Sequence, residues 1–318
     1  MRKVLTIGEA LIDFIPEEKG VSLKDVSKFI KCPGGAPANV AATISKLGGE
    51  SAFIGKLGND GFGDFIIENL RNANVNTDYI LRTDKANTAL AFVVLKDDGD
   101  REFSFYRKPS ADMLLDKSEI KEAWFDKGDI LHFSSVDLIE APVKYAHIRA
   151  IEIAKEKECI VSFDPNVREP LWDDLKECKR TILEFIPKAD ILKISTDEIE
   201  FITGKNNERE SIDSFFVGDV KIVILTRGKD GASIFTKDKE VNINGIEIKA
   251  IDTTGAGDSF IGAFLYNIIN KEIDISNISY DLLKSIGDFS NKVGAITASR
   301  KGAISSTPTI EEVENISL

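Results

Sequence analysis

Asp252-Thr253-Thr254-Gly255-Ala256-Gly257-Asp258-Ser259-Phe260, which leads into an apolar helical pattern through Ile269, is the most informative stretch of the chain. The small residues at 255–257 allow a ligand to approach the backbone closely, and the helix predicted over 258–269 adds the positive end of its dipole. The stretch predicts an anion hole for phosphate charge that develops during transfer, with Asp258 beside the reacting hydroxyl. The same letters also fit a glycine turn in which Asp258 is an ordinary aspartate at a helix start.

A second glycine-rich stretch, Gly34-Gly35-Ala36-Pro37-Ala38-Asn39, opens another predicted helix, over 38–47. Paired glycines permit close contact with a small ligand, and the side chain of Asn39 can donate and accept hydrogen bonds toward sugar hydroxyls. A tight turn followed by a helix start explains the same pattern. This stretch therefore does not by itself distinguish a binding site from a turn.

Both stretches lie in a chain that alternates apolar, β-branched runs with amphipathic segments. This alternation predicts an α/β fold, with a mostly parallel central sheet and helices on both faces. Strands are predicted over 4–8, 130–134, 160–164, 191–194 and 221–226, and helices over 38–47, 64–72, 141–157, 196–203, 258–269 and 282–298.

Two strand-like runs, over 88–95 and 101–106, interrupt this alternation. They are joined by Lys96-Asp97-Asp98-Gly99-Asp100, which is typical of a hairpin turn. Short strands over 11–15 and 28–32 could pair beside this hairpin. We therefore predict one domain spanning 1–318, with a small β-sheet lid contributed by about residues 10–33 and 87–108.

The composition excludes several classes of partner. The formal net charge of −12 over 318 residues argues against nucleic acid or an acidic membrane as a partner, because phosphate binding on that scale needs a basic surface. A nucleotide is still allowed, since a few backbone N–H groups and one or two cations can hold its phosphates. No stretch approaches the ~20 apolar residues of a membrane span, and no signal peptide is evident, so we expect a cytoplasmic protein.

Several common catalytic motifs are absent from the sequence. It contains no P-loop, no Gly-x-Gly-x-x-Gly after the first strand and no Gly-x-Ser-x-Gly, which disfavours a P-loop enzyme, a dinucleotide-binding protein and a serine hydrolase. Its three cysteines and two histidines have no metal-ligand spacing.

Taken together, the two glycine-rich stretches resemble the two signatures of ribokinase-type (PfkB) carbohydrate kinases. They occur in the same order and about 220 residues apart, and the resemblance runs from about Ile7 to Pro308. It implies a ribokinase-like fold and transfer of a phosphoryl group from ATP, with Mg²⁺, to a sugar. The family also places a β lid over its sugar, in agreement with the hairpin predicted from the pattern alone.

The resemblance implies roles for individual residues at the sugar. Asp258 matches the catalytic base, and Gly255, Ala256 and Gly257 match the anion hole. The residues that match contacts to the sugar are Asp13, Gly34, Gly35 and Asn39. The alternative role of Asp13 is that of an ordinary carboxylate in a lid or turn.

For the nucleotide, the resemblance implies a loop at 226–231 and an asparagine near the adenine. The matching residues are Thr226, Gly228, Gly231 and Asn291, while Lys193 and Ser195 would lie close to the phosphates. Glu198 resembles the acidic end of a family Asn-x-x-Glu motif that organises water around Mg²⁺. Ser195 replaces the asparagine of that motif, which leaves the role of Ser195 open.

A loop for a monovalent cation, K⁺, is also implied by the resemblance. Its residues in this chain are Asp252, Thr254, Gly302 and Ser306. Short polar loops near a C-terminus are common, so this match is the least specific of the set.

Four further stretches resemble fructokinases of the family, especially the plant type. They are residues 36–41, 88–93, 107–115 and 164–172. This resemblance implies D-fructose as the substrate and fructose 6-phosphate as the product, with Arg107 and Arg168 as substrate-binding residues. A 2-keto-3-deoxygluconate kinase, or another sugar kinase of the family, is the alternative, since Tyr106, Arg107 and Arg168 could hold the carboxylate of a sugar acid.

A non-catalytic sugar-binding relative is the alternative from another class. The intact Gly255-Ala256-Gly257-Asp258 run argues against it, because a protein that only binds sugar needs no base at that place. Since lid strands with apolar edges often pair, a homodimer that forms through the lid is also predicted.

Overall fold

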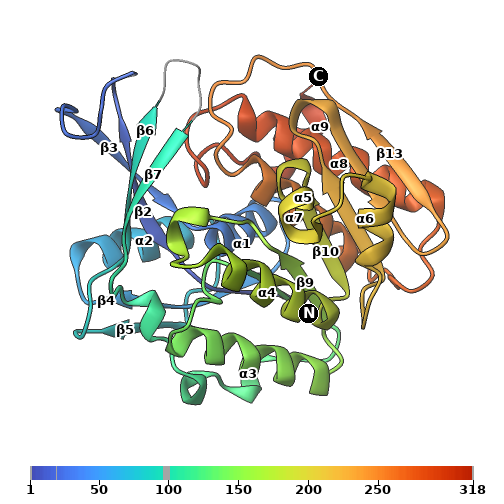
Figure 1. Ribbon diagram of the computed structural model, residues 1–318, viewed down its shortest axis with the longest axis horizontal. Coiled ribbons are helices and arrows are strands. Elements are labelled where there is room, and N and C mark those ends of the chain that lie inside the picture. The colour runs from blue at the N-terminus through green and yellow to red at the C-terminus, as the bar shows by residue number, and fades with distance from the viewer. Residues whose placement is uncertain (1, 19, 96–100, 317–318) are drawn as a thin grey trace.

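The computed structural model describes residues 2–18, 20–95 and 101–316. The hairpin turn predicted over 96–100 lies outside these residues. The described strands form two sheets, a large central sheet and a small separate one (Figure 1).

The central sheet has nine strands among the described residues. Every pair of neighbouring strands between β5 and β11 is parallel. At the β11 side of the sheet, β12 pairs antiparallel with β11, and β13 pairs antiparallel with β12. In spatial order the strands are β13 (Glu240–Asn244), β12 (Gly231–Phe235), β11 (Ile222–Thr226), β10 (Ile191–Ser195), β9 (Ile160–Asp164), β8 (Ile130–Ser134), β1 (Val4–Ile7), β4 (Ser51–Gly58) and β5 (Ile80–Thr83).

Helices cover both faces of this sheet, because its strands are apolar on both sides and need cover on each. One apolar cluster joins α1, α7 and α8 to the sheet, and another joins α3, α4 and α5 to the opposite face. The helices are α1 (Ala36–Lys46), α2 (Gly61–Asn72), α3 (Pro142–Glu156), α4 (Leu175–Phe185), α5 (Thr196–Thr203), α6 (Glu208–Ser214), α7 (Ala256–Asn270), α8 (Tyr280–Ala298) and α9 (Ile310–Asn315).

The second sheet is the predicted lid, which lies at the left of Figure 1, far from β13. Its four strands, in spatial order, are β3 (Phe29–Gly34), β2 (Leu11–Pro16), β6 (Leu90–Leu95) and β7 (Arg101–Tyr106). Strands β2 and β6 pair parallel, and the two outer pairs are antiparallel. Leu11, Phe103 and Phe105 share one face of the lid, while Phe14 stacks on Phe92 on the other face at 4.9 Å between ring centroids.

The predicted fold class is confirmed, and most predicted elements are present with shifts of a few residues at their ends. Several elements were missed, including one central strand, β4, and both antiparallel edge strands, β12 and β13. The helices α4, α6 and α9 were also missed. None of the described helices is both long enough and apolar enough to cross a membrane.

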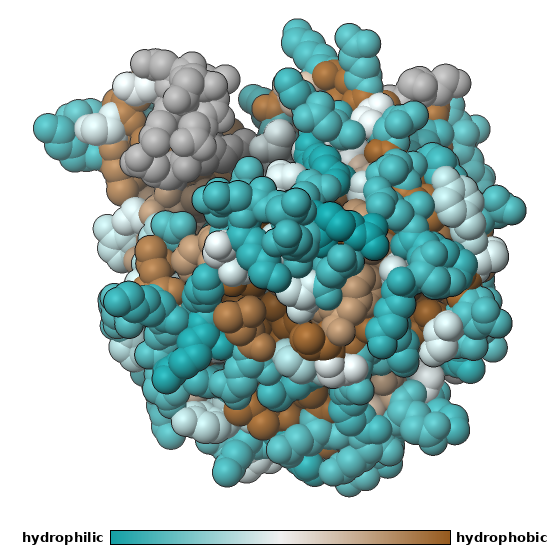
Figure 2. Space-filling view, turned by 45° about the vertical axis from the view of Figure 1, so that its right-hand side comes forward, coloured by the Kyte–Doolittle hydropathy of each residue, from teal (hydrophilic) through white to brown (hydrophobic). Residues whose placement is uncertain are grey.

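Hydrophilic side chains predominate on the face shown in Figure 2, and hydrophobic areas are confined to patches between them. This distribution agrees with a chain in which 30% of the residues are charged and 42% are hydrophobic. Most of the buried apolar residues belong to the two clusters that pack the helix layers against the sheet.

Candidate active site

A cavity of about 1100 Å³ lies under the lid, where the carboxyl ends of the parallel strands meet. Ligands of open α/β sheets bind at this edge, because loops and helix N-termini converge there. Among the lining residues are nine predicted from the sequence, namely Asp13, Gly35, Asn39, Arg168, Lys193, Thr254, Gly255, Gly257 and Asp258. Residues from distant parts of the chain are thus brought to one place.

Asp258 and Asn39 meet across two helices at this cavity. Helix α7 starts after Gly255, whose φ of 77° favours glycine, and this places Asp258 in the first turn of the helix. The Asn39 Nδ2 group, on α1, donates to Asp258 Oδ2 at 2.8 Å. Burial raises the pKa of Asp258, while the Asn39 hydrogen bond and the charges of Lys193 and Arg168 oppose that rise.

Gly34 and Gly35 hold the backbone close to two acidic residues. A Cβ atom on Gly34 would collide with the carboxylate of Asp13, and one on Gly35, which has φ of 107°, would collide with the carbonyl oxygen of Glu9. Asp13 sits on β2 opposite Cys32 and faces the cavity from the lid. Both glycines are therefore required where the lid strand meets the start of α1.

Lys193 forms a buried ion pair at the floor of the cavity. Its Nζ lies 2.7 Å from Asp164 Oδ2, and the two side chains are 8% and 3% exposed. Burial raises the pKa of Asp164 to about 6. Burial alone would lower the pKa of Lys193, but Asp164 and Glu198 reverse this and raise it, so the amine stays charged. A methyl group on Gly257 would lie 3.2 Å from Lys193 Nζ, which places this cation beside the first turn of α7.

Glu198 and Ser195 lie beside the cavity but do not line it. Glu198 Oε2 accepts hydrogen bonds from Ser195 N at 2.9 Å and Ser195 Oγ at 2.8 Å, which caps α5. Its other oxygen, Oε1, accepts from Val167 N at 2.6 Å. Glu198 thus links the loop after β9 to the start of α5. This structural contact is separate from the predicted role of Glu198 in organising water around Mg²⁺.

Two oxygen-bearing side chains that the sequence analysis did not select line the cavity next to these residues. Asn166 has φ of 44° in the loop after β9, and Asp197 follows the end of β10. Each of them closely follows a strand that the sequence predicts. A position at the carboxyl end of a parallel strand could therefore have identified both as candidate site residues. Glu9, Phe103 and Phe105 were missed as well.

The two predicted substrate arginines are placed differently. Arg168 lines the cavity, and its NH1 group donates to the carbonyl oxygen of Val167 at 3.1 Å. Arg107 does not line the cavity: it is 3% exposed and forms ion pairs with Asp112 and Asp137. Arg107 is therefore held by two carboxylates instead of facing the cavity.

The residues predicted for the nucleotide gather at another part of the same sheet edge. Thr226 ends β11, and Gly228 lies in the short turn before β12. Gly231 pairs with Asn244 on β13, and Asn291 Nδ2, on α8, donates to the Asn244 carbonyl oxygen at 2.8 Å. The turn is thus next to Asn291, although none of these residues lines the large cavity.

The two loops predicted to hold a monovalent cation are in contact. Asp252 Oδ1 accepts from Thr254 N at 2.8 Å, and Asp252 Oδ2 accepts from Gly302 N at 3.1 Å. Ser306 is buried and donates to the carbonyl oxygen of Ala303 at 2.8 Å. Ala303 also packs against Gly255, because a Cβ atom there would lie 2.9 Å from its methyl group. The loops therefore support the start of α7.

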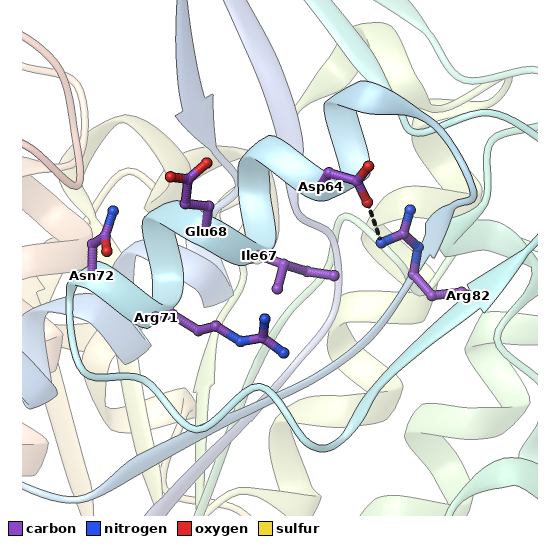
Figure 3. A pocket seen from close by; sticks show the side chains of 6 residues that line it. All are labelled: Asp64, Ile67, Glu68, Arg71, Asn72 and Arg82. Carbon is purple, nitrogen blue, oxygen red and sulfur yellow. Dashed lines mark hydrogen bonds and ion pairs between the residues drawn. The ribbon is translucent and has the colours of Figure 1, made fainter.

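A second hollow, of about 440 Å³, lies on the outer side of α2. Figure 3 shows Arg82 of β5 turned toward Asp64, with which it forms a 2.8 Å ion pair. The Nε group of Arg71 donates to Thr77 Oγ1 at 2.9 Å. Both arginines are thus engaged by the protein, and the hollow shares no residue with the large cavity.

Comparison with protein families gives a match to the model described as pfkB family carbohydrate kinase, over residues 1–310. A curated relative, the probable fructokinase-2 of Arabidopsis thaliana, is 45% identical over 307 residues, which cover 96% of this chain and 93% of the relative.

Two solved structures show the same fold over nearly the whole chain. A fructokinase from Xylella fastidiosa with bound ATP has a TM-score of 0.90 and 32% identity, covering 98% of this chain and 97% of the other. A double mutant of a fructokinase from Vibrio cholerae with bound fructose, ADP and potassium has a TM-score of 0.87 and 34% identity, covering 99% and 97%.

Proposed function

The chain belongs to the pfkB family of carbohydrate kinases, and from this premise we propose that it is a fructokinase that transfers the γ-phosphoryl group of ATP directly to the 6-hydroxyl of D-fructose, with Asp258 as general base. The observation that carries this proposal is the position of Asp258. It stands in the first turn of α7, hydrogen-bonded to Asn39, at a cavity that Lys193 and Arg168 also line.

In this mechanism Asp258 accepts the proton of the sugar hydroxyl as the new O–P bond forms. The bond between that phosphorus atom and the bridging oxygen of ADP breaks at the same time, so ADP leaves with the electron pair. Asn39 orients the carboxylate, because its amide N–H group donates to Oδ2 and leaves Oδ1 for the substrate. A carboxylate whose pKa is raised is also a stronger base than an exposed aspartate.

The start of α7 supplies the electrostatic stabilisation. The N–H group of Ala256 donates to the carbonyl oxygen of Thr253 at 3.2 Å, so the anion hole rests chiefly on Gly255 and Gly257. The helix dipole and the ammonium group of Lys193 beside Gly257 add positive charge where the phosphoryl group passes. Asp164 keeps that ammonium group charged and oriented.

The family implies magnesium with the nucleotide, and the donor set fits such an ion. The described residues hold no group of three or more His, Cys, Asp or Glu arranged for a metal, whereas Asn166 and Asp197 offer oxygen donors at the cavity. Mg²⁺ is commonly held by one or two carboxylates and by substrate phosphates, and it supplies neutralisation of phosphate charge.

A monovalent cation, K⁺, fits the paired loops at Asp252 and Gly302. Asp252 fixes both loops through the N–H groups of Thr254 and Gly302, which holds the oxygen-bearing residues of the two loops close together. Potassium bound there would stiffen the support beneath Gly255. The potassium-bound double mutant of the Vibrio cholerae fructokinase, which has the same fold, supports the choice of potassium as the ion.

We also propose that the lid forms a homodimer. Its edge strands, β3 and β7, carry the exposed apolar side chains Ile30 and Tyr106, which are 51% and 60% exposed. Exposed strand edges with apolar side chains pair readily with another copy. Sedimentation of the wild type and of Ile30→Lys tests this, with a shift toward monomer expected only in the variant.

The function itself is tested by measuring ADP release from purified protein with fructose, ribose, adenosine and 2-keto-3-deoxygluconate. Fructose is expected to give the highest kcat/KM. A preference for the keto acid would overturn the choice of sugar and leave the kinase assignment intact. Binding of fructose without any ADP release would instead favour a non-catalytic relative.

A further inference from the structure

A buried group of charged residues borders the cavity through Glu9. Arg107 follows β7, Asp112 lies in the turn after it, and Asp137 and Glu9 follow β8 and β1. All four side chains are nearly inaccessible, with exposed fractions between 0% and 3%. We call these residues the Arg107 cluster.

One cation therefore faces three carboxylates in this cluster. The NH2 group of Arg107 donates to Asp112 Oδ2 and to Asp137 Oδ1. Glu9 interacts electrostatically with both Arg107 and Asp137, and its Oε1 accepts from Ala36 N at 3.0 Å. Ser110 Oγ donates to the second oxygen of Asp112. A single ionised carboxylate already balances the guanidinium charge, and every further ionisation makes the cluster negative.

The cluster also has buried polar atoms that no described residue satisfies. They are Glu9 Oε2, Asp137 Oδ2, and Nε and NH1 of Arg107. Buried polar atoms in native proteins nearly always have a partner, which can be water or a ligand. Glu9 lines the cavity, as do Ala36 and Phe105, so a ligand in the cavity can reach this end of the cluster.

We propose that the Arg107 cluster makes the enzyme selective for neutral sugars over sugar acids, because its carboxylates cancel the arginine charge and Glu9 accepts a sugar hydroxyl. This inference rests on the proposed function and names what decides its substrate class. Arg107 has the residue type that would hold a carboxylate, yet Asp112 and Asp137 bind its NH2 group and cancel its charge. An acid substrate would lie next to Glu9, where lost hydration, and repulsion once Glu9 is ionised, oppose its binding.

The test removes the carboxylates and keeps the arginine. For the wild type, Asp112→Asn and Asp137→Asn, kcat/KM is measured above pH 8, where these carboxylates are ionised, with D-fructose and with 2-keto-3-deoxygluconate. Each variant is expected to raise the ratio of keto acid to fructose by about tenfold or more, since it adds one net positive charge near the site. A ratio within twofold of the wild type in both folded variants would overturn the proposal.

Asp129→Asn is the matched control. Asp129 is also fully buried and ion-paired, with Lys3, and it precedes β8, whereas Asp137 follows that strand. Its loss costs stability without touching the cavity, so the substrate ratio should stay within twofold of the wild type. A change equal to that in Asp137→Asn would mean that general loosening, not charge, sets the ratio, and would also overturn the proposal.

A charge-balanced double variant separates charge from shape. Arg107→Met combined with Asp137→Asn removes one charge of each sign, so the substrate ratio should return to within about threefold of the wild type. A ratio as high as that of Asp137→Asn alone would contradict the charge argument. If both single variants fail to fold, by thermal unfolding, Glu9→Gln, assayed above pH 8 where the wild-type Glu9 is ionised, gives the same test with the same expected rise and the same contrary outcome.

The two proposals fail in different ways. A wild type that phosphorylates no fructose contradicts the proposed function. A wild type that prefers fructose, with variants whose substrate ratio does not move, contradicts only the role of the cluster.

Discussion

Asn39 Nδ2 lies 2.8 Å from Asp258 Oδ2, although 219 positions separate the two residues in the chain. The contact joins the first turns of α1 and α7, so each glycine-rich stretch supplies one half of it. It fixes the direction of the carboxylate that we propose as the base.

The first prediction concerns Asp258. Asp258→Asn keeps the size of the side chain but cannot accept a proton, so kcat should fall by roughly 10² to 10⁴ while KM values for fructose and ATP change far less. Steady-state kinetics measures this, and Asp64→Asn on the outer side of α2 serves as a control that should keep wild-type rates. Near-normal kcat in Asp258→Asn would place the base elsewhere.

The second concerns Asn39. Asn39→Ala removes a hydrogen bond that lowers the pKa of Asp258, so that pKa should rise further above its ordinary value of 3.8. Because the base acts only when ionised, the acidic limb of the pH–kcat profile should move to higher pH. Loss of a hydrogen bond to a charged group should also lower kcat/KM by roughly 10- to 100-fold. A slower enzyme with an unmoved acidic limb would show that Asn39 only contacts the sugar.

The third concerns the buried ion pair. Lys193→Met leaves Asp164 without its partner and should destabilise the protein by about 3–5 kcal/mol, as measured by urea unfolding. Adding Asp164→Asn should restore most of that stability. Activity should stay low in both variants, since each lacks the cation beside Gly257. Recovery of activity together with stability would mean that Lys193 acts only through folding.

The fourth concerns Glu9 and the pH dependence of stability. Burial first, and then Asp137, raise the pKa of Glu9 to about 8 from its ordinary 4.5, with Arg107 opposing the rise. A raised carboxyl pKa contributes stability that is complete below pH 4.5 and is lost as pH rises through 8. The free energy of unfolding of the wild type, relative to Glu9→Gln, should therefore fall across this window by at most about 1.4 kcal/mol per pH unit.

Urea unfolding at several pH values measures that difference. Glu200→Gln, an exposed change on α5, should show a constant difference from the wild type over the same window. A difference for Glu9→Gln that grows in favour of the wild type with rising pH would contradict the sign of the shift.

The fifth concerns cations. Activity should require magnesium and should rise when potassium replaces a bulky organic cation, because potassium would stiffen the loops that support Gly255. In Asp252→Ala, which loses the acceptor for the N–H groups of Thr254 and Gly302, the potassium effect should be much reduced. Equal wild-type rates in potassium and in the organic cation would contradict the potassium site.

A strand or helix could be predicted from the sequence where the local residue pattern matches the burial of that segment in the fold. Strands such as β8 and β9 are short runs in which apolar residues predominate, and Gly255 marks the start of α7. Strand β4 was missed because its eight residues include two glycines and Lys56, which break the apolar run although every position is buried. Its assignment depends on tertiary pairing with β1.

The site was predictable residue by residue but not in its contacts. Residue type and motif selected Asp258, Asn39 and Lys193, all of which line the cavity. The spacing of Ser195 and Glu198 is that of a capping box, so their contact was predictable, but no pattern could show that Glu198 would also accept a hydrogen bond from Val167. Likewise, the residue type of Arg107 suggests a ligand-binding arginine, and only the folded structure shows the carboxylates that surround it. Side-chain partners far apart in sequence are set by packing, which a single sequence does not display.

Strand β1 has consequences for how the chain folds during synthesis. Although it is the first strand made, its neighbours on either side are β4 and β8, so its backbone groups stay unpaired until residues 51–54 and 130–133 have emerged. Such long-range parallel pairing makes folding slow and leaves an exposed strand edge on the nascent chain. A ribosome-bound fragment that stops before Ser134 should therefore remain sensitive to protease and should recruit chaperones, whereas one that includes β8 and α3 should begin to resist digestion.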